Sequence, residues 1–126
     1  MPKYSEQSLA RLSTCHEDLR KIFYEVIKVM DVTILEGHRT QDLQQKAFAE
    51  GKSRAMWPMS KHNKYPSLAV DVVPYPIDWD DREQFFRMAG IVQGIAKQMD
   101  IEVNWGGDWS FFDGPHFELP KPHKAR

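Results

Sequence analysis

The pattern of apolar and polar positions predicts three amphipathic helices. The first follows Thr14, which forms a capping box with Glu17, and its apolar residues recur at helical spacing as far as Met30. A second, short helix over residues 40–51 starts at a threonine N-cap, ends at a glycine and carries only a thin apolar stripe, which indicates a position at the surface. The third begins in an acidic segment and continues amphipathically over residues 78–99.

Four short segments predict β-strands. Residues 32–35 and 68–73 are compact runs of β-branched and apolar residues, and residues 101–105 and 116–119 form two further runs. Residues 52–67 are dense in turn formers and predict a long ordered loop, a kind of segment that is usually functional. Helices and strands do not alternate as they do in a parallel sheet, so the fold class predicted is α+β, with packed helices and a small antiparallel sheet.

Length and composition narrow the class of protein. The chain has 126 residues, which favours one domain over residues 1–126 with a Pro/Lys-rich tail from residue 119. Its 17 Lys and Arg against 18 Asp and Glu give a net charge of −1, so no global positive field attracts nucleic acid. The single cysteine, Cys15, excludes an internal disulfide and a thiolate metal cage. Without a secretory signal or an apolar run of about 18 residues, we expect no membrane span.

Three segments carry candidate chemistry. They are Ser60-Lys61-His62 in the long loop, Ala69-Val70-Asp71 in an apolar strand and Asp113-Gly114-Pro115-His116 before the last strand. Two imidazoles and one carboxylate supply the three protein ligands of a catalytic zinc site, and a fourth group beside the metal can act as general base. A free charge on Asp71 would be costly in an apolar strand, and coordination of a cation explains it. Taken alone, Asp71 could instead be satisfied by backbone donors.

The neighbours of His116 add further candidates. The Gly-Pro pair forms a tight turn that can direct Asp113 toward the metal, although composition alone also fits an ordinary turn residue. The two-residue period of a strand places His116 and Glu118 on one face and Phe117 in the core. Glu118 then either faces solvent or holds the tautomer of a ligating imidazole. The aromatic residues at 105–112 are interpreted as core and loop packing.

Together these segments resemble the zinc-dependent LAS-type (M15) peptidases of peptidoglycan. That family includes VanX- and VanY-like D-Ala-D-Ala peptidases and phage L-alanyl-D-glutamate endolysins. The matching motifs are Gly37-His38-Arg39-Thr40, Ser60-x-His62, Ala69-x-Asp71 and Asp113-x-x-His116. The resemblance spans residues 37–118 and implies a Hedgehog/DD-peptidase-like fold.

The resemblance also implies a role for each matching residue. One Zn²⁺ per chain would be held by His62, Asp71 and His116. Asp113 is similar to the general base of the family, Arg39 is similar to the arginine that contacts the substrate carbonyl or carboxylate, and Ser60 is expected at the substrate. From the residues alone, Arg39 could simply pair with Glu36 or cap a helix.

Two departures from the family pattern bear on this interpretation. Eight residues separate His62 from Asp71, two more than usual, and Ser67 occupies the place of the usual glycine. A loop can absorb two residues while the strand still presents its carboxylate. The base is Asp113 where carboxypeptidase relatives tend to carry Glu, which is more like the endopeptidase branch.

The function implied is hydrolysis of the peptidoglycan stem peptide between L-Ala and D-Glu by a monomeric phage endolysin without a separate wall-binding domain. Such an enzyme is made in the host cytoplasm without a signal peptide and reaches periplasmic peptidoglycan after holin-type release. The alternatives are a D-Ala-D-Ala carboxypeptidase or dipeptidase and a non-catalytic, zinc-stabilised module that binds muropeptide. The net charge of −1 disfavours a His-metal nuclease.

Overall fold

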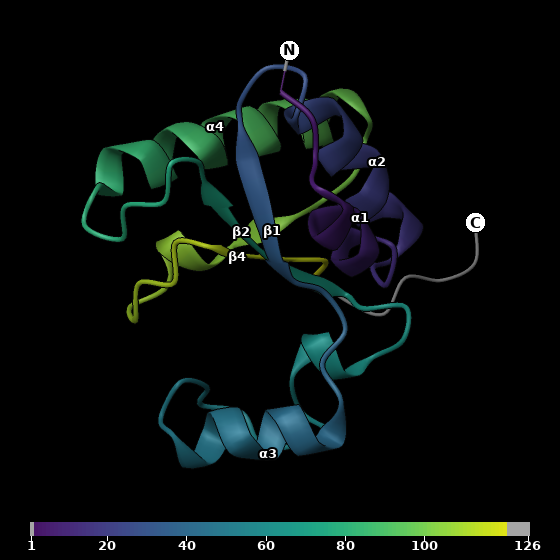
Figure 1. Ribbon diagram of the computed structural model, residues 1–126, viewed down its shortest axis with the longest axis vertical. Coiled ribbons are helices and arrows are strands. Elements are labelled where there is room, and N and C mark those ends of the chain that lie inside the picture. The colour runs from purple at the N-terminus through teal and green to yellow at the C-terminus, as the bar shows by residue number, and fades with distance from the viewer. Residues whose placement is uncertain (1, 121–126) are drawn as a thin grey trace.

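An antiparallel sheet lies at the centre of the fold in a computed structural model that describes residues 2–120 (Figure 1). The elements in chain order are α1 (Glu6–Leu12), α2 (Glu17–Val26), β1 (Val32–Glu36), α3 (Gln41–Ala49), the 3-10 turn η1 (Lys61–Asn63), β2 (Ala69–Pro74), α4 (Arg82–Gln98), β3 (Asn104–Trp105), the 3-10 turn η2 (Gly106–Asp108) and β4 (His116–Glu118). The strand order is β1-β2-β4-β3, and every neighbouring pair is antiparallel. The predicted α+β class with a small antiparallel sheet is therefore confirmed.

The register of the sheet brings polar side chains from three strands together. Asp71 of β2 pairs with His116 of β4. On the other side of β2, the pairing with β1 is irregular between Ile34 and Glu36, and Glu36 becomes the partner of Asp71. Asp71 therefore lies between a histidine and a glutamate in an otherwise apolar strand.

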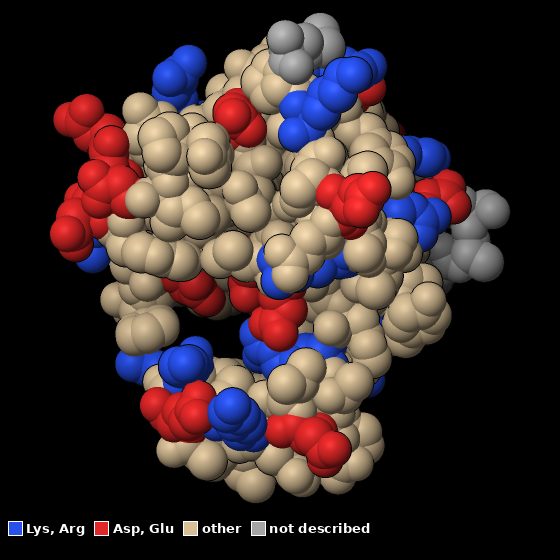
Figure 2. All heavy atoms as spheres, viewed as in Figure 1, with Lys and Arg blue, Asp and Glu red and all other residues tan. Residues whose placement is uncertain are grey.

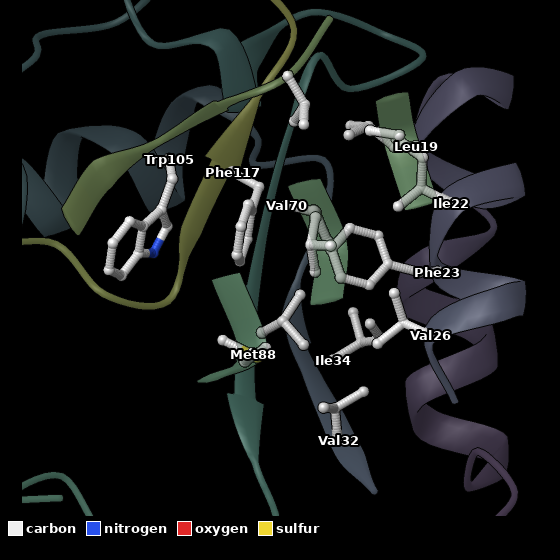
Figure 3. Packing of buried hydrophobic residues seen from close by; sticks show 14 of the residues in the cluster. Leu19, Ile22, Phe23, Val26, Val32, Ile34, Val70, Met88, Trp105 and Phe117 are labelled. Atoms are coloured by element: carbon white, nitrogen blue, oxygen red, sulfur yellow. The ribbon is translucent and has the colours of Figure 1, made fainter. Parts of the chain in front are cut away.

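The hydrophobic core fills the space between the sheet and its helices. α1 packs against β1, α2 against α4, and α4 against β2. Phe23 of α2 meets Phe117 of β4 edge to face with ring centroids 5.7 Å apart, and Val70, Ile34 and Met88 surround the pair (Figure 3). All five side chains are buried, and burying a side chain of this size is worth about 1.5–3 kcal/mol.

α3 lies apart from this core, beside the long loop that follows it (Figure 1). We call residues 40–66 the α3 lobe and the remaining described residues the body. Within α3 itself only Gln44 is buried, whereas Leu43 and Phe48 are exposed, which confirms the predicted surface position. The hydrogen bonds of the Gln44 side-chain amide hold the lobe together where an apolar core is lacking. The amide oxygen accepts from Arg39 Nη1 and Asn63 Nδ2. The amide nitrogen donates to Ser53 Oγ and the Ala55 carbonyl.

The predicted start of the first long helix is wrong. α2 begins at Glu17 with His16 as its N-cap, whose Nδ1 accepts from the Asp18 N–H at 3.0 Å. The Thr14 hydroxyl instead donates to the Arg11 carbonyl at 2.7 Å and accepts from the His38 N–H at 2.8 Å. A capping box would need the Thr14 hydroxyl oxygen to accept from the Glu17 N–H. In the structure this oxygen accepts from the distant His38 N–H instead. α2 ends at Val26, although the apolar pattern continues to buried Met30.

The other elements follow the predictions with smaller differences. Thr40 caps α3 and Asp81 caps α4. The strand expected over residues 101–105 is reduced to two residues, Asn104–Trp105, and α1 was not predicted. None of the helices described combines the length and apolarity needed to cross a bilayer. The predicted tail lies, from residue 121 onward, outside the described residues.

Candidate metal centre

His62 is oriented by two neighbouring groups in the α3 lobe and the body. It belongs to η1, where the Ser60 hydroxyl accepts from its backbone N–H at 3.2 Å. The His62 ring donates from Nδ1 to the Gly37 carbonyl at 2.7 Å, since a carbonyl can only accept. A glycine is required at position 37 because a Cβ there would overlap the Arg11 backbone carbonyl and Thr14 Oγ1. His62 Nε2 is left with a lone pair, is buried and has no hydrogen-bond partner within residues 2–120.

His116 presents its other nitrogen to the same point. Its Nε2 lies 2.8 Å from Glu118 Oε1, so this nitrogen carries the proton and donates to the carboxylate. Its Nδ1 lies 3.2 Å from Asp71 Oδ1, and His62 Nε2 lies 3.3 Å from that same oxygen. Two imidazole nitrogens therefore converge on one carboxylate oxygen.

This arrangement fits a metal cation. One ligand atom each from His62, Asp71 and His116 lies within 4.8 Å of the other two. Burial alone would raise the pKa of Asp71, but the His62 and His116 rings, when they are protonated, outweigh it through their charge and hydrogen bonds and hold the pKa well below its usual range. Burial lowers the pKa of His116, yet hydrogen bonds with Asp71 and Glu118 raise it to about 9. The site thus favours positive charge between imidazole and carboxylate, and the orphaned Nε2 of His62 offers its lone pair to a cation at this point.

Asp113 lies beside this group without belonging to it. Its carbonyl accepts from the His116 N–H at 3.1 Å, which closes the predicted tight turn, and its Oδ2 lies 3.9 Å from His116 Nδ1. Burial raises the pKa of Asp113, and the negative charge of Asp71 raises it further. Asp113 therefore accepts a proton more readily than an exposed aspartate does.

Arg39 is held mainly by protein groups. Its Nε donates to Glu36 Oε1 at 2.9 Å, its Nη1 donates to Gln44 Oε1 at 2.8 Å, and its Nη2 lies 3.7 Å from Asp71 Oδ2. The pairing with Glu36 that the sequence left open is present. The same side chain also lines the cleft beside Asp71, so the two interpretations of Arg39 are compatible.

Glu118 joins the two histidine-bearing segments. Its Oε1 accepts from His116, and its Oε2 lies 2.9 Å from Lys61 Nζ. Lys61 is the neighbour of His62 and also donates to the Leu119 carbonyl at 2.6 Å. Burial alone would raise the pKa of Glu118, but hydrogen bonds with His116 and Lys61 outweigh it and lower the pKa. Of the two positions expected for Glu118, the structure therefore has the one beside His116.

The candidate ligands lie on the wall of a cleft between the body and the α3 lobe. Figure 2 shows this hollow, with acidic side chains on the body side and basic side chains on the lobe side. A cavity of about 510 Å³ is lined by His62, Asp71, His116, Asp113 and Ser60, among others. Trp109 also lines it, with its ring 5.0 Å from the His116 ring. All the residues singled out in the sequence as candidates thus surround one cavity or support its wall.

Comparisons with known proteins assign the chain to a family. Residues 1–120 match the family model of the phage L-alanyl-D-glutamate peptidases. The chain belongs to this family. It is 28% identical over 124 residues to the L-alanyl-D-glutamate peptidase of Escherichia phage T5, with 94% of this chain and 90% of the phage protein covered.

A solved structure supports the same assignment. The crystal structure of the Serratia marcescens L-Ala D-Glu endopeptidase ChiX is similar to this chain with a TM-score of 0.80 and 28% identity. The match covers 93% of this chain and 90% of the Serratia chain. The resemblance stated from the four motifs is confirmed, and with it the prediction that the chain is an enzyme of the peptidase class.

Some residues of the site carried no signal that sequence reasoning could use. Gln44 shares a helix face with Ala47 and Phe48, but it is polar and both of its neighbours in the sequence of α3 are exposed, so nothing local marks its side chain as fully buried. In the sequence, Lys61 is simply the residue between Ser60 and His62. Its contact with Glu118 joins segments 57 residues apart in sequence, and no local pattern reports such a pair.

Proposed function

We propose that the chain is a zinc-dependent endopeptidase that hydrolyses the amide bond between L-Ala and D-Glu in the stem peptide of bacterial peptidoglycan. The observation that carries the proposal is the convergence of His62 Nε2, Asp71 and His116 Nδ1 in a cleft, with Asp113 beside them. Membership of the L-alanyl-D-glutamate peptidase family supports the choice of bond.

His62, Asp71 and His116 would hold one zinc ion. Two neutral imidazoles and a carboxylate are the ligand set of catalytic zinc sites that keep an open position. When bound, zinc supplies Lewis acidity, which activates water and polarises the scissile carbonyl. The Gly37 carbonyl and Glu118 hold the two rings in the tautomers that leave the ligating nitrogens unprotonated.

Asp113 acts as the general base and then as the general acid. Its raised pKa suits it to take a proton from the attacking water and to deliver it to the departing nitrogen of D-Glu. Arg39, fixed by Glu36 and Gln44 beside Asp71, has guanidinium N–H groups left for the oxygen of the scissile carbonyl. Ser60 sets the position of His62 as the cap of η1 and lines the cavity, where it contacts substrate.

In its biological setting the chain acts as a monomeric endolysin in host lysis. It is made in the cytoplasm of the infected cell and reaches periplasmic peptidoglycan after holin-type release. Expression in a Gram-negative host tests this route: culture turbidity should fall only after the inner membrane is permeabilised. Lysis without permeabilisation would contradict the need for a release partner.

Digestion of purified sacculi tests the chemistry. Mass spectrometry of the products should show new D-Glu amino termini, and a chelator should abolish their formation until zinc is restored. Release of free D-Ala alone would favour a carboxypeptidase. Binding to sacculi without any new terminus would favour a non-catalytic module.

Two variants separate the roles within the site. Asp113→Ala should retain one equivalent of zinc and lose hydrolysis, because the base does not bind the metal. His62→Ala should lose both, because it removes a ligand. Hydrolysis by Asp113→Ala at the wild-type rate would refute the assignment of the base.

A further inference from the structure

The cleft has two arms that meet at the candidate metal centre. A second cavity, of about 600 Å³, adjoins the cavity of about 510 Å³ that holds the histidines. Both cavities are lined by Arg39, Lys52, Asp71, Phe111 and Asp113. A peptide lying across Asp71 and Asp113 would therefore extend into one arm on each side of its reacting bond.

The two arms differ in chemistry. The arm that adjoins His62 contains the basic side chains Arg54 and Lys61. The other arm is lined by an apolar set that the first arm lacks: Leu35, Leu43, Ala47, Trp79 and Pro115. Outside the shared residues, the second arm also holds Lys46, Glu36 and Glu50, with a net charge of −1, whereas Arg54, Lys61 and Glu118 give the first arm a net charge of +1. The first arm is therefore the better place for an anionic group, and the second for an uncharged, apolar one.

Most cations along the cleft already have a carboxylate partner. Arg39 pairs with Glu36, Lys61 with Glu118, and Lys52 with Glu50 at 3.4 Å. Arg54 differs, because within residues 2–120 it forms no ion pair, and its guanidinium lies 4.3 Å from the centre of the Phe111 ring. Stacking on an aromatic face leaves the N–H groups at the guanidinium edge free for a carboxylate.

The contact between Arg54 and Phe111 also spans the cleft. Arg54 belongs to the α3 lobe, and Phe111 belongs to the segment of the body between β3 and β4. The ring holds the guanidinium at the cavity wall, which lowers the entropy lost when the side chain binds a ligand. Arg54 is therefore a positioned charge, unlike an isolated surface arginine.

A substrate cut between L-Ala and D-Glu carries the group that such a charge recognises. Glutamate has two carboxyl groups, and only one can continue the stem peptide, so the other remains as a carboxylate next to the reacting bond. We infer that Arg54, backed by Phe111, binds this free carboxylate of D-Glu, and that the alanyl side of the substrate extends into the apolar arm. This inference rests on the proposed endopeptidase function.

The test compares two synthetic stem peptides that differ in one group. One contains L-Ala-D-Glu with its free carboxylate, and the other carries a carboxamide in place of that carboxylate. A charge-assisted hydrogen bond is worth about 1.5–3 kcal/mol, so the wild-type protein should prefer the acid peptide by roughly 10- to 100-fold in kcat/KM. In Arg54→Gln this preference should disappear through a higher KM for the acid peptide, with cleavage of the amide peptide unchanged.

Matched variants serve as controls. Arg87→Gln removes an exposed arginine of α4 that lines neither cavity and should keep the wild-type preference. Arg54→Lys should restore part of the preference, because a lysine keeps the charge without the planar fork. Zinc content, measured for each variant, should remain one equivalent because Arg54 is not a ligand.

The outcomes separate this inference from the function on which it rests. If the wild-type protein cleaves neither peptide, the proposed function fails. If it cleaves both peptides at equal kcat/KM, or if Arg54→Gln keeps the preference for the acid, the proposed function stands and the role of Arg54 is refuted.

Discussion

The body and the α3 lobe are held together by different kinds of interaction. The body has a continuous core in which Phe23, Phe117 and Val70 are fully buried. The α3 lobe exposes Leu43 and Phe48 and is organised around the hydrogen bonds of one amide side chain, Gln44. Apolar burial provides most of the stability of a fold, whereas each hydrogen bond adds about 0.5–1.5 kcal/mol net. The lobe is therefore expected to open more readily than the body.

The metal centre lies on the boundary between these two regions. Asp71 and His116 are neighbours in the sheet of the body, and His62 comes from the lobe. The lobe is tied to the body next to this residue, because the Arg39 N–H donates to the His62 carbonyl at 2.7 Å and His62 Nδ1 donates to Gly37. The third ligand thus depends on polar contacts, while the other two are fixed by core packing.

The largest effect on global stability is expected from the core of the body. Phe23→Ala removes a fully buried ring that contacts Phe117, and such truncations cost about 3–5 kcal/mol through lost burial and the cavity left behind. Urea unfolding should show this loss for the whole chain. Val29→Ala, at a position 61% exposed, is the control and should change the free energy of unfolding by less than about 0.5 kcal/mol.

A smaller and local effect is expected from the lobe. Gln44→Ala removes the acceptor of Arg39 Nη1, at a cost of about 1–3 kcal/mol, whereas Asn63 Nδ2 and the Ala55 carbonyl each lose one of two hydrogen bonds. Hydrogen exchange should accelerate over residues 40–66 and remain unchanged in β2 and α4. Peptide hydrolysis should fall, because Arg39 loses one of the groups that fix it.

The neighbouring residue provides the control for Gln44. Gln45→Ala makes the same truncation one position along α3, where the side chain is exposed, and should leave exchange in the lobe unchanged. Equal acceleration in both variants would mean that general helix propensity, and not the buried amide, holds the lobe.

The same contrast explains which features the sequence could reveal. Apolar periodicity located α4, β1 and β2, and local caps located α3 through Thr40, because these signals depend on residues near one another in sequence. The motifs also named the residues that line the cleft. The prediction that Thr14 caps α2 is wrong because the Thr14 hydroxyl accepts a hydrogen bond from the His38 N–H, 24 residues away. The contacts of Gln44 and Lys61 are equally non-local, so only the folded chain reveals them.

Lys61 tests how the two regions are coupled at the metal centre. Lys61→Met removes the ammonium group that holds Glu118 and thereby weakens the orientation of His116. Loss of a partner that orients a ligating histidine typically costs about 10- to 100-fold in metal affinity, so zinc affinity measured by chelator competition should fall by this factor. Lys61→Arg should recover part of the affinity.

A nearby lysine separates this effect from a general loss of charge. Lys64→Met changes an exposed lysine of the same lobe and should leave zinc affinity unchanged. If Glu118→Gln is already present, adding Lys61→Met should have little further effect, because both changes break one chain of contacts. Additive losses would show that Lys61 acts elsewhere, for example through its bond to the Leu119 carbonyl.

The natural thiol gives the most sensitive comparison of body and lobe. Cys15 is fully buried in the body, and burial raises the pKa of its thiol to about 12, so iodoacetamide at pH 8 should not modify the native protein. In Phe23→Ala, labelling measured by mass spectrometry should be roughly 150- to 5,000-fold faster, because a loss of about 3–5 kcal/mol raises the globally unfolded population accordingly. In Gln44→Ala it should be nearly unchanged, since opening the lobe does not expose Cys15. Equal acceleration in the two variants would show that body and lobe unfold as one unit.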